Sequence, residues 1–577
     1  MPGNAITCSA LRFRKDSWPS FLVLVSSFTA FYATIEVFLF ANRNIFGTTG
    51  IGNDAVMLLI SFLNVAPAGL FAFSVVSALP PRVCSQYNEE SVMRFAPLRL
   101  KARVALLYTT FNDFLPEYAS YNFEQSELIA REGSENAASC RCSFFILDDS
   151  TLSSKRKEVD RFAAEHDRCK VLRRASRKGY KAGAINNWVR AYGQNFDYIF
   201  ILDTDSQASA SAIKKCLDLA RRDPRLALIQ TKTLTMTSNP SKMTKSSVTI
   251  QHAYMAVVQN AMRNMGSSPY YGHNALARID ALRKIGGFIE ESNEDYKTLA
   301  RLHNAGYESL YAQSAVTWEE IPPDYFGARK RALRWARDAV GQLGLLRFRV
   351  PLCMIIYLIY GWVTYMANIV MLGLFFLLSV RSFSLQISNM GLLGDLAGIL
   401  TMSVIVLWPM LSLRVSDPEL NVKSIASAVL WGTVFSVPMT APVSLQIART
   451  TCAKLGAALR GALGLMKSSV NEEFVVTPKV RSEGGTFGSV LGKLKVEFLL
   501  GSAPLFLALA SGAYFFLLFS LAQILSLILL PLFIFSETSP HRSFRHVPIS
   551  AKEYALNYNR RTVVPQGTPQ YVYLATR

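Results

Sequence analysis

The chain has 577 residues, half of them hydrophobic and only 18% of them charged. Ordinary soluble domains carry roughly a quarter charged residues, so this composition excludes a disordered chain and argues against a purely soluble protein. The 61 basic and 41 acidic residues give a formal charge of +20, which predicts an anionic partner such as acidic phospholipid, nucleotide diphosphate or nucleic acid. The eight cysteines are scattered without metal-ligand spacing, and we interpret them as reduced thiols.

The N-terminal region, residues 1–82, is predicted to form a transmembrane hairpin. Residues 21–41 carry one charge, Glu36, and residues 55–79 carry none. A membrane-spanning helix needs about 20 apolar residues, so each run predicts one crossing. Basic residues precede the first run, whereas the loop between the runs holds a single arginine. The positive-inside rule therefore places the N-terminus and the region after the hairpin in the cytosol.

Residues 83–349 form a mixed polar stretch of the size of one large soluble domain. Apolar strands are predicted at residues 104–107, 143–147 and 198–202, and helical stretches follow them. This alternation predicts an α/β domain of βαβ units with a parallel sheet. In such sheets ligands bind at the carboxyl ends of the strands. The polar side chains found there are those of Thr109, Asp113, Asp148, Asp149, Asp203 and Asp205.

The triplet Asp203-Thr204-Asp205 places two carboxylates beside one turn. Oxygen ligands at this spacing suit Mg²⁺ or Mn²⁺, which also bridge phosphate oxygens. The triplet alone is a weak indication, because an aspartate after a strand is usually a helix cap or a turn residue. Lys181 ends the basic stretch 173–181, which is either a solvated charge run or the source of the cation that a diphosphate needs.

Two more motifs complete the polar stretch. Glu294 and Asp295 follow a glycine-rich turn, where they are either acidic residues at a helix N-terminus or the site of a general base. Arg334 and Trp335 lie just before the next apolar run, which is typical of a helix on the membrane surface.

The C-terminal part returns to the membrane. Residues 350–414 hold two uncharged runs and predict a second transmembrane hairpin, and residues 496–536 hold one run long enough for a third. The tail, residues 537–577, is basic and is expected to be cytosolic.

Residues 415–470 are predicted to be interfacial helices. They contain the uncharged run 424–448, which is interrupted by Pro438 and Pro442. If this run crosses the membrane, the total is seven crossings and the basic tail ends outside. If it lies in the interface, the total is six and both ends stay in the cytosol, which the charge distribution favours.

The order of these motifs resembles that of the processive family-2 glycosyltransferases, the membrane-embedded synthases of cellulose, curdlan, chitin and hyaluronan. The motifs are Asp148-Asp149, Lys181-Ala-Gly, Asp203-x-Asp205, Glu294-Asp295 and Arg334-Trp335. The resemblance implies an α/β GT-A (Rossmann-like) cytosolic domain, residues 83–349, inserted in an α-helical transmembrane region. It also implies about six spans plus interfacial helices.

The resemblance gives each motif an expected role. Donor binding is expected from Thr109, Asp113, Asp148, Asp149, Lys181, Asp203 and Arg334. The metal, Mg²⁺ or Mn²⁺, is expected on Asp203 and Asp205. Asp295 is expected to be the catalytic base, and Trp335 is expected to stack on the acceptor sugar.

Residues 471–495 are expected to form a cytosolic gating loop. Phe474-Val-Val-Thr477-Pro-Lys479 resembles the Phe-x-Val-Thr-x-Lys loop of cellulose-synthase-like enzymes, which implies that Thr477 and Lys479 bind the donor. The alternative is an ordinary linker. Because the loop must reach the nucleotide, an even number of crossings must precede it, which again places residues 424–448 in the interface.

The sequence departs from the family pattern at two places. Arg331 stands where the family has glutamine. Tyr270-Tyr-Gly-His-Asn274 stands where many relatives have Phe-x-Cys-Gly-Thr, and it resembles the Gly-His-Asn segment of the osmoregulated periplasmic glucan glucosyltransferases. The alternative for the histidine is a buried, hydrogen-bonded side chain. Acceptor contacts are expected from Gly272, His273, Asn274 and Glu294.

Together these features imply a processive inverting glycosyltransferase that polymerises UDP-glucose into a β-glucan, either β-1,3 curdlan-like or β-1,4 cellulose-like, and secretes it through its own channel. The expected partners are the UDP-sugar, the growing polysaccharide and membrane lipids, with no nucleic acid. The expected location is the plasma or inner membrane, with several crossings. The alternatives are a chitin- or hyaluronan-type synthase using UDP-N-acetylglucosamine, a non-processive lipid glycosyltransferase, and a transporter with a nucleotide-binding domain.

Overall fold

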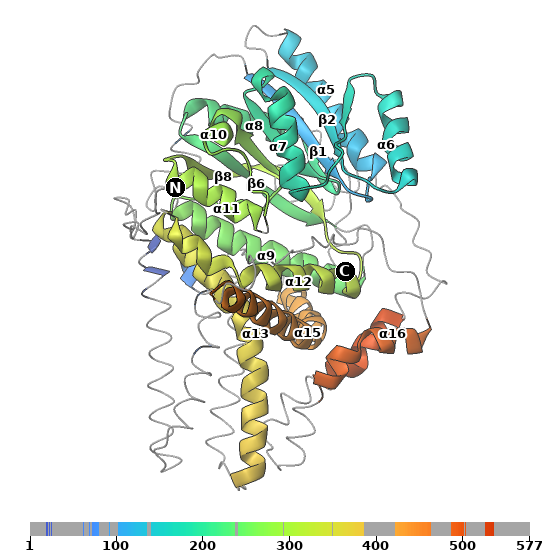
Figure 1. The fold of residues 1–577 in the computed structure, drawn as a ribbon, viewed down its shortest axis with the longest axis vertical. Helices are drawn as coiled ribbons and strands as arrows, with labels where there is room; N and C mark the ends of the chain where they lie inside the picture. Colours follow the sequence, from blue (N-terminus) through green and yellow to red (C-terminus); the bar gives the residue numbers. More distant parts are fainter. Residues whose placement is uncertain are drawn as a thin grey trace.

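The computed structural model describes most of the predicted α/β domain, residues 83–349, and several helices beneath it. The described residues are 102–135, 140–236, 241–291, 293–348, 350–385, 422–462, 486–500 and 525–535, with a few positions before residue 93 and Ser502. The sheet and its covering helices lie at one end of the molecule, and a long helix extends away from the other end (Figure 1). The predicted runs 21–41, 55–79 and 396–413 lie largely or wholly outside the described residues.

One eight-stranded sheet, in the order β3-β2-β1-β4-β7-β6-β8-β5, forms the centre of the domain. Its first half is parallel, as the sequence predicts, and consists of β3 (Cys169–Leu172), β2 (Cys140–Asp148), β1 (Ala102–Thr110) and β4 (Tyr198–Asp203). These strands are uninterrupted apolar runs because they are covered on both faces. The three predicted strands are therefore confirmed as β1, β2 and β4.

The second half of the sheet is mixed, so the prediction of a wholly parallel sheet is wrong. It consists of β7 (Ala275–Arg278), β6 (Leu226–Met236), β8 (Glu308–Glu320) and β5 (Ser206–Ala208). β7 runs antiparallel to both of its neighbours, and β5 runs antiparallel to β8. The reversal arises because the chain leaves β6 through helix α9 and re-enters the sheet from the same end, between β4 and β6.

The strand register brings the carboxyl ends of the parallel half together. Thr109 of β1 lies opposite Asp203 of β4, and Thr110 lies opposite Asp148 of β2. Side chains alternate between the two faces of each strand, so Leu107 enters one hydrophobic core and Leu106 enters the other. The polar residues after the strands are thus presented at a single edge of the sheet.

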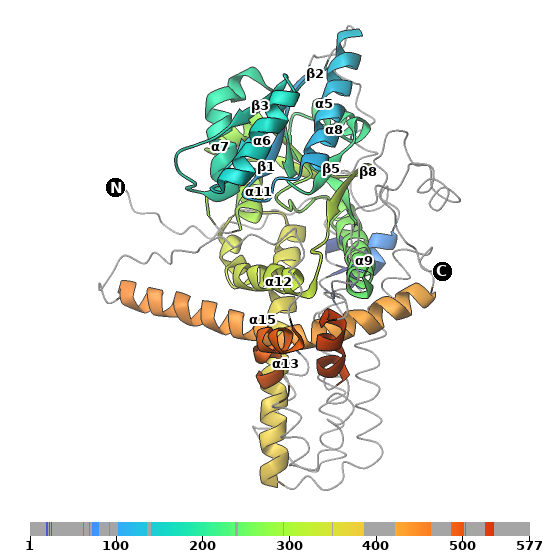
Figure 2. The same ribbon diagram turned by 90° about the vertical axis from the view of Figure 1, so that its right-hand side faces the viewer.

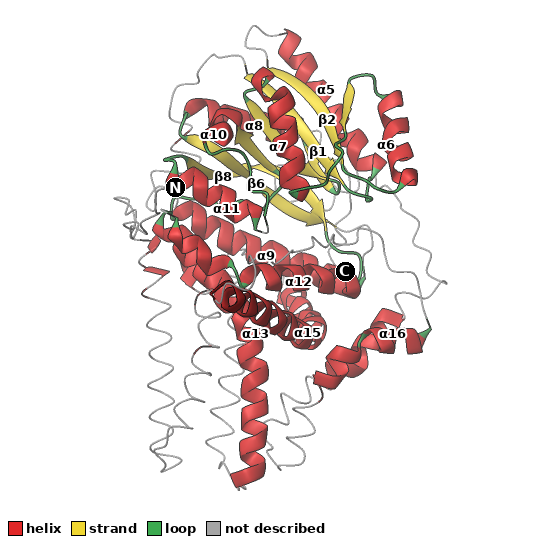
Figure 3. Cartoon of the chain, in the orientation of Figure 1, coloured by secondary structure: helices red, strands yellow, loops and turns green. Residues whose placement is uncertain are grey.

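Helices cover both faces of the sheet (Figure 3). One core contains side chains from α7 (Tyr180–Tyr192), α10 (Ile279–Lys284) and α11 (Glu294–Asn304). The other contains side chains from α5 (Pro116–Glu135), α6 (Ser153–Glu165) and α8 (Ala210–Arg222). The helix predicted at residues 209–222 is confirmed, with Ser209 as its N-cap accepting the amide of Ala212 at 3.2 Å.

A second group of helices lies beneath the domain (Figure 2). It consists of α9 (Lys242–Asn264), α12 (Tyr325–Ala339), α13 (Leu352–Leu385), α15 (Val422–Ala462) and α16 (Phe487–Lys493), and the short 3-10 turn η3 (Gln342–Arg347) precedes α13. Among the described residues, α13 alone contains a stretch long and apolar enough to cross a membrane, Leu352–Val370 with mean hydropathy 1.6. This stretch lies within the hairpin predicted for residues 350–414.

Helix α15 runs across α13 rather than beside it (Figure 2). It is one continuous helix that contains Pro438 and Pro442, although each proline removes a backbone hydrogen bond, so the interruption expected at the prolines is absent. Packing compensates, since Val443 and Ile447 bury themselves against Ala336 of α12 and side chains of α13. The assignment of residues 415–470 as interfacial helices stays a prediction.

Candidate active site

The carboxylate of Asp203 forms the centre of a polar cluster at the end of β4. Lys181 of α7 forms an ion pair with its Oδ1 atom. Thr109 donates a hydrogen bond from Oγ1 to the carbonyl of Leu202 at 3.1 Å and lies 3.3 Å from Asp203 Oδ1. The Asp203 side chain is about one third exposed, so this cluster combines an accessible carboxylate with a fixed cation.

His273, in the turn before β7, lies on the other side of Asp203. Its Nδ1 atom is 3.8 Å from Asp203 Oδ2, and its Nε2 atom is 2.5 Å from Glu319 Oε2 of β8. Burial acts to lower the pKa of His273, but the charges of Asp203 and Glu319 outweigh it and raise the pKa above its ordinary value. The His273 side chain is partly buried and hydrogen-bonded, and it directly adjoins Asp203.

The preceding residue, Gly272, connects this turn to the acidic motif. Its φ is +84°, in the left-handed region that favours glycine. A Cβ atom at this position would lie 3.9 Å from Glu294 Oε1 and 4.0 Å from Asp295 Cβ. The Gly-His segment and the Glu-Asp motif, some twenty residues apart in the sequence, thus form two walls of one site.

Asp295 and Glu294 open helix α11 and are both partly buried. Burial, and after it the charge of Glu294, raise the pKa of Asp295 to about 8. The pKa of Glu294 is also raised, chiefly by burial, while the positive charges of Lys181 and Arg334 oppose the rise. A carboxyl group with a pKa near neutrality is a competent general base at physiological pH.

Helix α12 supplies the remaining predicted residues. Its start is capped by Asp324, whose carboxylate accepts the amide of Gly327 at 2.7 Å. Near its end the carbonyl of Asp338 accepts a hydrogen bond from Asn293 Nδ2 at 2.8 Å, which joins α12 to the residue before Glu294. Trp335 of this helix is 42% exposed, so its ring has a face available for a ligand.

The first two aspartates of the site are engaged with arginines that the sequence did not single out. Asp148 is buried, and its Oδ2 atom accepts a hydrogen bond from Arg173 Nε at 2.6 Å. Asp149 forms a two-bond pair with Arg174, at 2.8 Å from Nε and 2.5 Å from Nη2. The basic stretch 173–181 is therefore not a solvated charge run, because its members neutralise the carboxylates at the end of β2.

Arg177 is a further residue of this region that the sequence gave no reason to select. Its guanidinium lies 3.3 Å from the centre of the Phe111 ring, in the loop that follows β1. Burial lowers the pKa of Arg177, and the charge of Asp149 opposes that effect. Planar stacking of this kind is suited to a flat nucleobase or ring, and only the three-dimensional contact reveals it.

Two predicted residues have mainly structural contacts. The Asp113 carboxylate accepts the Thr110 hydroxyl at 3.0 Å and the Phe111 amide at 2.8 Å, which folds the loop after β1. Asn274 is fully buried, and its backbone carbonyl accepts hydrogen bonds from Thr231 and Gln230. In this structure Asn274 shapes the turn, and its Nδ2 atom donates to the carbonyl of Trp318 at 3.5 Å.

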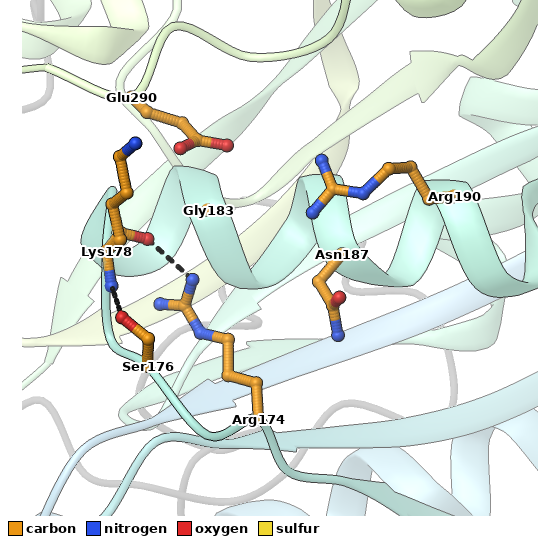
Figure 4. Close-up of a pocket in the computed structure, with 7 residues that line it drawn as sticks. All are labelled: Arg174, Ser176, Lys178, Gly183, Asn187, Arg190 and Glu290. Atoms are coloured by element: carbon orange, nitrogen blue, oxygen red, sulfur yellow. Dashed lines mark hydrogen bonds between the residues drawn. The ribbon is translucent and has the colours of Figure 1, made fainter.

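A basic hollow of about 430 Å³ lies along α7, next to Arg174 (Figure 4). Its lining residues are Arg174, Ser176, Lys178, Gly183, Asn187, Arg190 and Glu290. A Cβ atom on Gly183 would lie 2.1 Å from the Lys178 carbonyl, so only glycine allows this approach. The glycine of the Lys-Ala-Gly motif therefore has a packing role, while Lys181 points to Asp203.

The chemistry of the site is compatible with a divalent metal ion. In the part of the chain that the structure describes, no three His, Cys, Asp or Glu side chains are grouped so as to hold a metal by themselves. Mg²⁺ usually keeps several waters and is bound by one or two carboxylates together with substrate phosphates. Asp203, partly exposed, and Asp205, two residues later and 3% exposed, fit that donor set.

The gating loop cannot be placed. Phe474, Thr477 and Lys479 lie outside the described residues, as does the whole of the tail 537–577. The segment after the loop is described from Thr486 onward, and its Glu497 accepts a hydrogen bond from Arg329 Nη1 of α12 at 2.6 Å.

Comparisons with known proteins find partial matches to glycosyltransferases. The chain is 30% identical over 202 residues to Glucomannan 4-beta-mannosyltransferase 9 of Arabidopsis thaliana, covering 33% of this chain and 37% of the relative. It is 26% identical over 321 residues to Glucans biosynthesis glucosyltransferase H of Bradyrhizobium diazoefficiens, covering 50% and 42%. The matched part thus spans about two fifths of the length of these curated relatives.

Among solved structures, a mannosyltransferase from Pyrobaculum calidifontis in complex with GDP-Man and Mn²⁺ has 15% identity and a TM-score of 0.43, with coverage of 65% of this chain and 98% of that one. Residues 198–416 match the family model described as Glycosyl transferase family group 2. This range begins at β4 and includes Asp203, the Glu294-Asp295 motif and α12. Residues 198–416 are therefore similar to the domain of family-group-2 glycosyl transferases.

Proposed function

We propose that the protein is a processive inverting glycosyltransferase that polymerises UDP-glucose into a β-glucan and passes the product through its own membrane helices. The observation that carries the proposal is the meeting of three separate motifs at one edge of the sheet. Asp203 with Lys181, Gly272 with its histidine neighbour, and the Glu294-Asp295 pair adjoin one another. A domain that only bound nucleotide would not need this partly buried acidic pair.

In this mechanism Asp295 is the general base. Its carboxylate removes the proton from the acceptor hydroxyl while that oxygen attacks the anomeric carbon of the donor, and the bond from the anomeric carbon to the diphosphate breaks. Attack opposite the leaving group inverts an α-linked donor to a β-linked product. Because the pKa of Asp295 is raised, its conjugate base is stronger than an ordinary aspartate.

The leaving diphosphate is bound by cations of the chain. Lys181 is held at the site by its ion pair with Asp203, and the charge of Arg334 acts to lower the pKa of Glu294. Both cations are therefore close to the place where negative charge develops. A divalent ion bound by Asp203 and Asp205 would supply further charge stabilisation to the phosphate oxygens. Fixed cations of this kind require no reorganisation during the reaction.

The acceptor sugar is expected to rest on Trp335. Its ring is 42% exposed, and a flat apolar ring suits the apolar face of a sugar. Processivity follows if the polymer remains on this ring after each transfer and moves on by one residue.

Membrane embedding is supported by the distribution of exposed apolar side chains. Most of the large exposed ones lie outside the catalytic domain, on the helices beneath it: Ile359, Leu430, Leu455, Leu499, Leu525, Ile528, Leu532 and Phe535. With α13 as a membrane span, α15 lies along the membrane plane, as a six-crossing topology requires. The gating loop remains part of the proposal, with Thr477 and Lys479 closing over the donor.

The names of the relatives favour a second candidate donor. Some are glucosyltransferases of glucan biosynthesis, and others are glucomannan 4-beta-mannosyltransferases. A GDP-mannose-dependent mannan synthase is therefore the second candidate.

The test is a donor panel with purified full-length protein in lipid nanodiscs. UDP-glucose, UDP-N-acetylglucosamine and GDP-mannose are supplied singly, nucleoside diphosphate release is measured, and any product is digested with linkage-specific hydrolases. Polymer made from UDP-glucose and cut by a β-glucanase supports the proposal. Polymer made from GDP-mannose alone would select the second candidate, and diphosphate release without polymer would exclude processive synthesis.

A further inference from the structure

A chain of three hydrogen bonds connects Arg331 of helix α12 to His273, which lies beside Asp203. Arg331 donates from Nη2 to Gln251 Oε1 of α9 at 3.2 Å, and Gln251 donates from Nε2 to Glu319 Oε1 of β8 at 2.9 Å. The other carboxylate oxygen of Glu319 is 2.5 Å from His273 Nε2. We refer to Gln251 and Glu319 as the bridge.

Each end of the bridge contacts a residue of the proposed active site. At one end, the guanidinium of Arg331 lies 4.8 Å from the centre of the Trp335 ring, on which the acceptor sugar is expected to rest. At the other end, His273 Nδ1 lies 3.8 Å from Asp203 Oδ2. The bridge therefore connects Arg331 and Trp335, which we call the acceptor platform, to the donor site at Asp203.

The chemistry of the bridge residues suits this position. A guanidinium only donates hydrogen bonds and a carboxylate only accepts them, whereas an amide does both. Gln251 uses both capacities, because it accepts from Arg331 and donates to Glu319. The Glu319 side chain is 14% exposed, and each of its oxygens has a hydrogen-bond partner. These contacts hold the carboxylate in one orientation.

The ends of the bridge are also the two places where the sequence departs from the family pattern. Arg331 replaces glutamine, and His273 belongs to the Gly-His-Asn segment that replaces Phe-x-Cys-Gly-Thr. The structure links these departures through a single carboxylate. A glutamine at position 331 is shorter and carries no charge, so it would not make the same stacked, charge-assisted contact.

We propose that Gln251 and Glu319 are positioning residues that hold the acceptor platform of Arg331 and Trp335 in register with Asp203. The inference rests on the proposed function and deepens it by naming residues that set acceptor position. Neither bridge residue needs to touch substrate. Their loss leaves the donor site intact but lets the acceptor hydroxyl drift from the anomeric carbon, and a misplacement of about 1 Å can cost roughly a hundredfold in rate.

The experiment uses full-length protein in nanodiscs with whichever donor gives transfer in the panel. The breaking variants are Gln251→Leu and Glu319→Ala, the conservative variant is Glu319→Gln, and the matched control is Glu320→Ala. Glu320 is adjacent in β8 and faces the opposite side of the sheet, where it accepts from the Tyr118 hydroxyl at 3.2 Å. The readouts are UDP affinity, sugar transferred to polymer, and free sugar released when water replaces the acceptor.

We expect both breaking variants to lose between about tenfold and a hundredfold in transfer, with UDP affinity unchanged and free sugar a larger share of the product. Glu319→Gln should recover part of the transfer, and Glu320→Ala should resemble the wild type. The double variant should lose no more than the worse single one, because both changes interrupt the same chain.

Three outcomes would overturn the inference. Breaking variants that keep the wild-type ratio of transfer to free sugar would show that the bridge does not position the acceptor. Breaking variants that lose UDP affinity in parallel with transfer would show a general structural role. Absence of transfer by the wild type with every donor would refute the proposed function itself and the inference with it. Thermal unfolding of each variant with UDP identifies any that fail to fold, and Gln251→Leu, on a helix surface, then decides alone.

Discussion

The raised pKa of Asp295 gives a prediction that can be worked through quantitatively. The change is Glu294→Gln, which removes the neighbouring charge and keeps the size of the side chain. Burial is the largest cause of the rise from 3.8 to about 8, and the Glu294 charge is the next. Removing that charge is therefore expected to lower the pKa of Asp295 by about one to two pH units, or roughly 1.4 to 2.7 kcal/mol.

The direction of the effect follows from the proposed role. The base must be deprotonated, so kcat/KM falls about tenfold per pH unit below the pKa of Asp295 in the free enzyme. The acid limb of the wild type should therefore lie near the raised pKa of about 8, and that of Glu294→Gln should lie below it by the same one to two pH units. The position of the limb is informative even if the substitution also weakens acceptor binding.

The assay is nucleoside diphosphate release measured from about pH 5.5 to pH 9.5 at limiting donor. The matched control is Glu291→Gln, which removes a charge from the same segment at a side chain that is 67% exposed and paired with Lys297. Solvent screens that charge, so the control should keep the wild-type limb. An identical limb in wild type and Glu294→Gln, or a wild-type limb near pH 4, would refute the reasoning.

Three further predictions concern single residues. Asp295→Asn should lower turnover by about 10²–10⁴-fold while UDP affinity, measured by titration calorimetry, stays the same; robust synthesis would remove the base assignment. Asp205→Asn should abolish the increase in UDP affinity that Mn²⁺ or Mg²⁺ produces, and an undiminished metal effect would contradict the ligand assignment. Arg329→Ala leaves the buried carboxylate of Glu497 without its cation, so the free energy of unfolding should fall by up to about 3 kcal/mol; an unchanged thermal midpoint would count against that contact.

The parts of the site that the sequence predicted are those set by local pattern. An apolar run of strand length that ends in polar residues predicts both the strand and the edge at which its polar residues emerge. Thr109 and Asp203 were placed in this way, and their pairing in the sheet confirms that they share one edge. The position of Ser209 as a helix cap follows from equally local chemistry.

The parts that the sequence did not predict depend on contacts between distant segments. The antiparallel course of β7 depends on the route of α9 beneath the sheet, and periodicity within a strand carries no information about its direction. Glu319 lies 46 residues from His273, and no spacing rule connects them. Arg173 and Arg174 looked like part of a surface charge run until the fold brought them to the carboxylates at the end of β2.

Helix α12 has a mechanical consequence, because two of its arginines face different partners. Arg329 contacts Glu497 in the segment after the loop, and Arg334 acts on Glu294 in the site. Five residues separate them, which corresponds to about 7.5 Å along the helix axis and about 140° around it. The two arginine side chains therefore leave the helix at different heights and in different directions, and a rotation of the helix moves both. If a change at Arg329 rotated the helix by about 20°, the end of the Arg334 side chain, about 6 Å from the axis, would move through roughly 2 Å. A movement of this size is enough to make or break a hydrogen bond to phosphate.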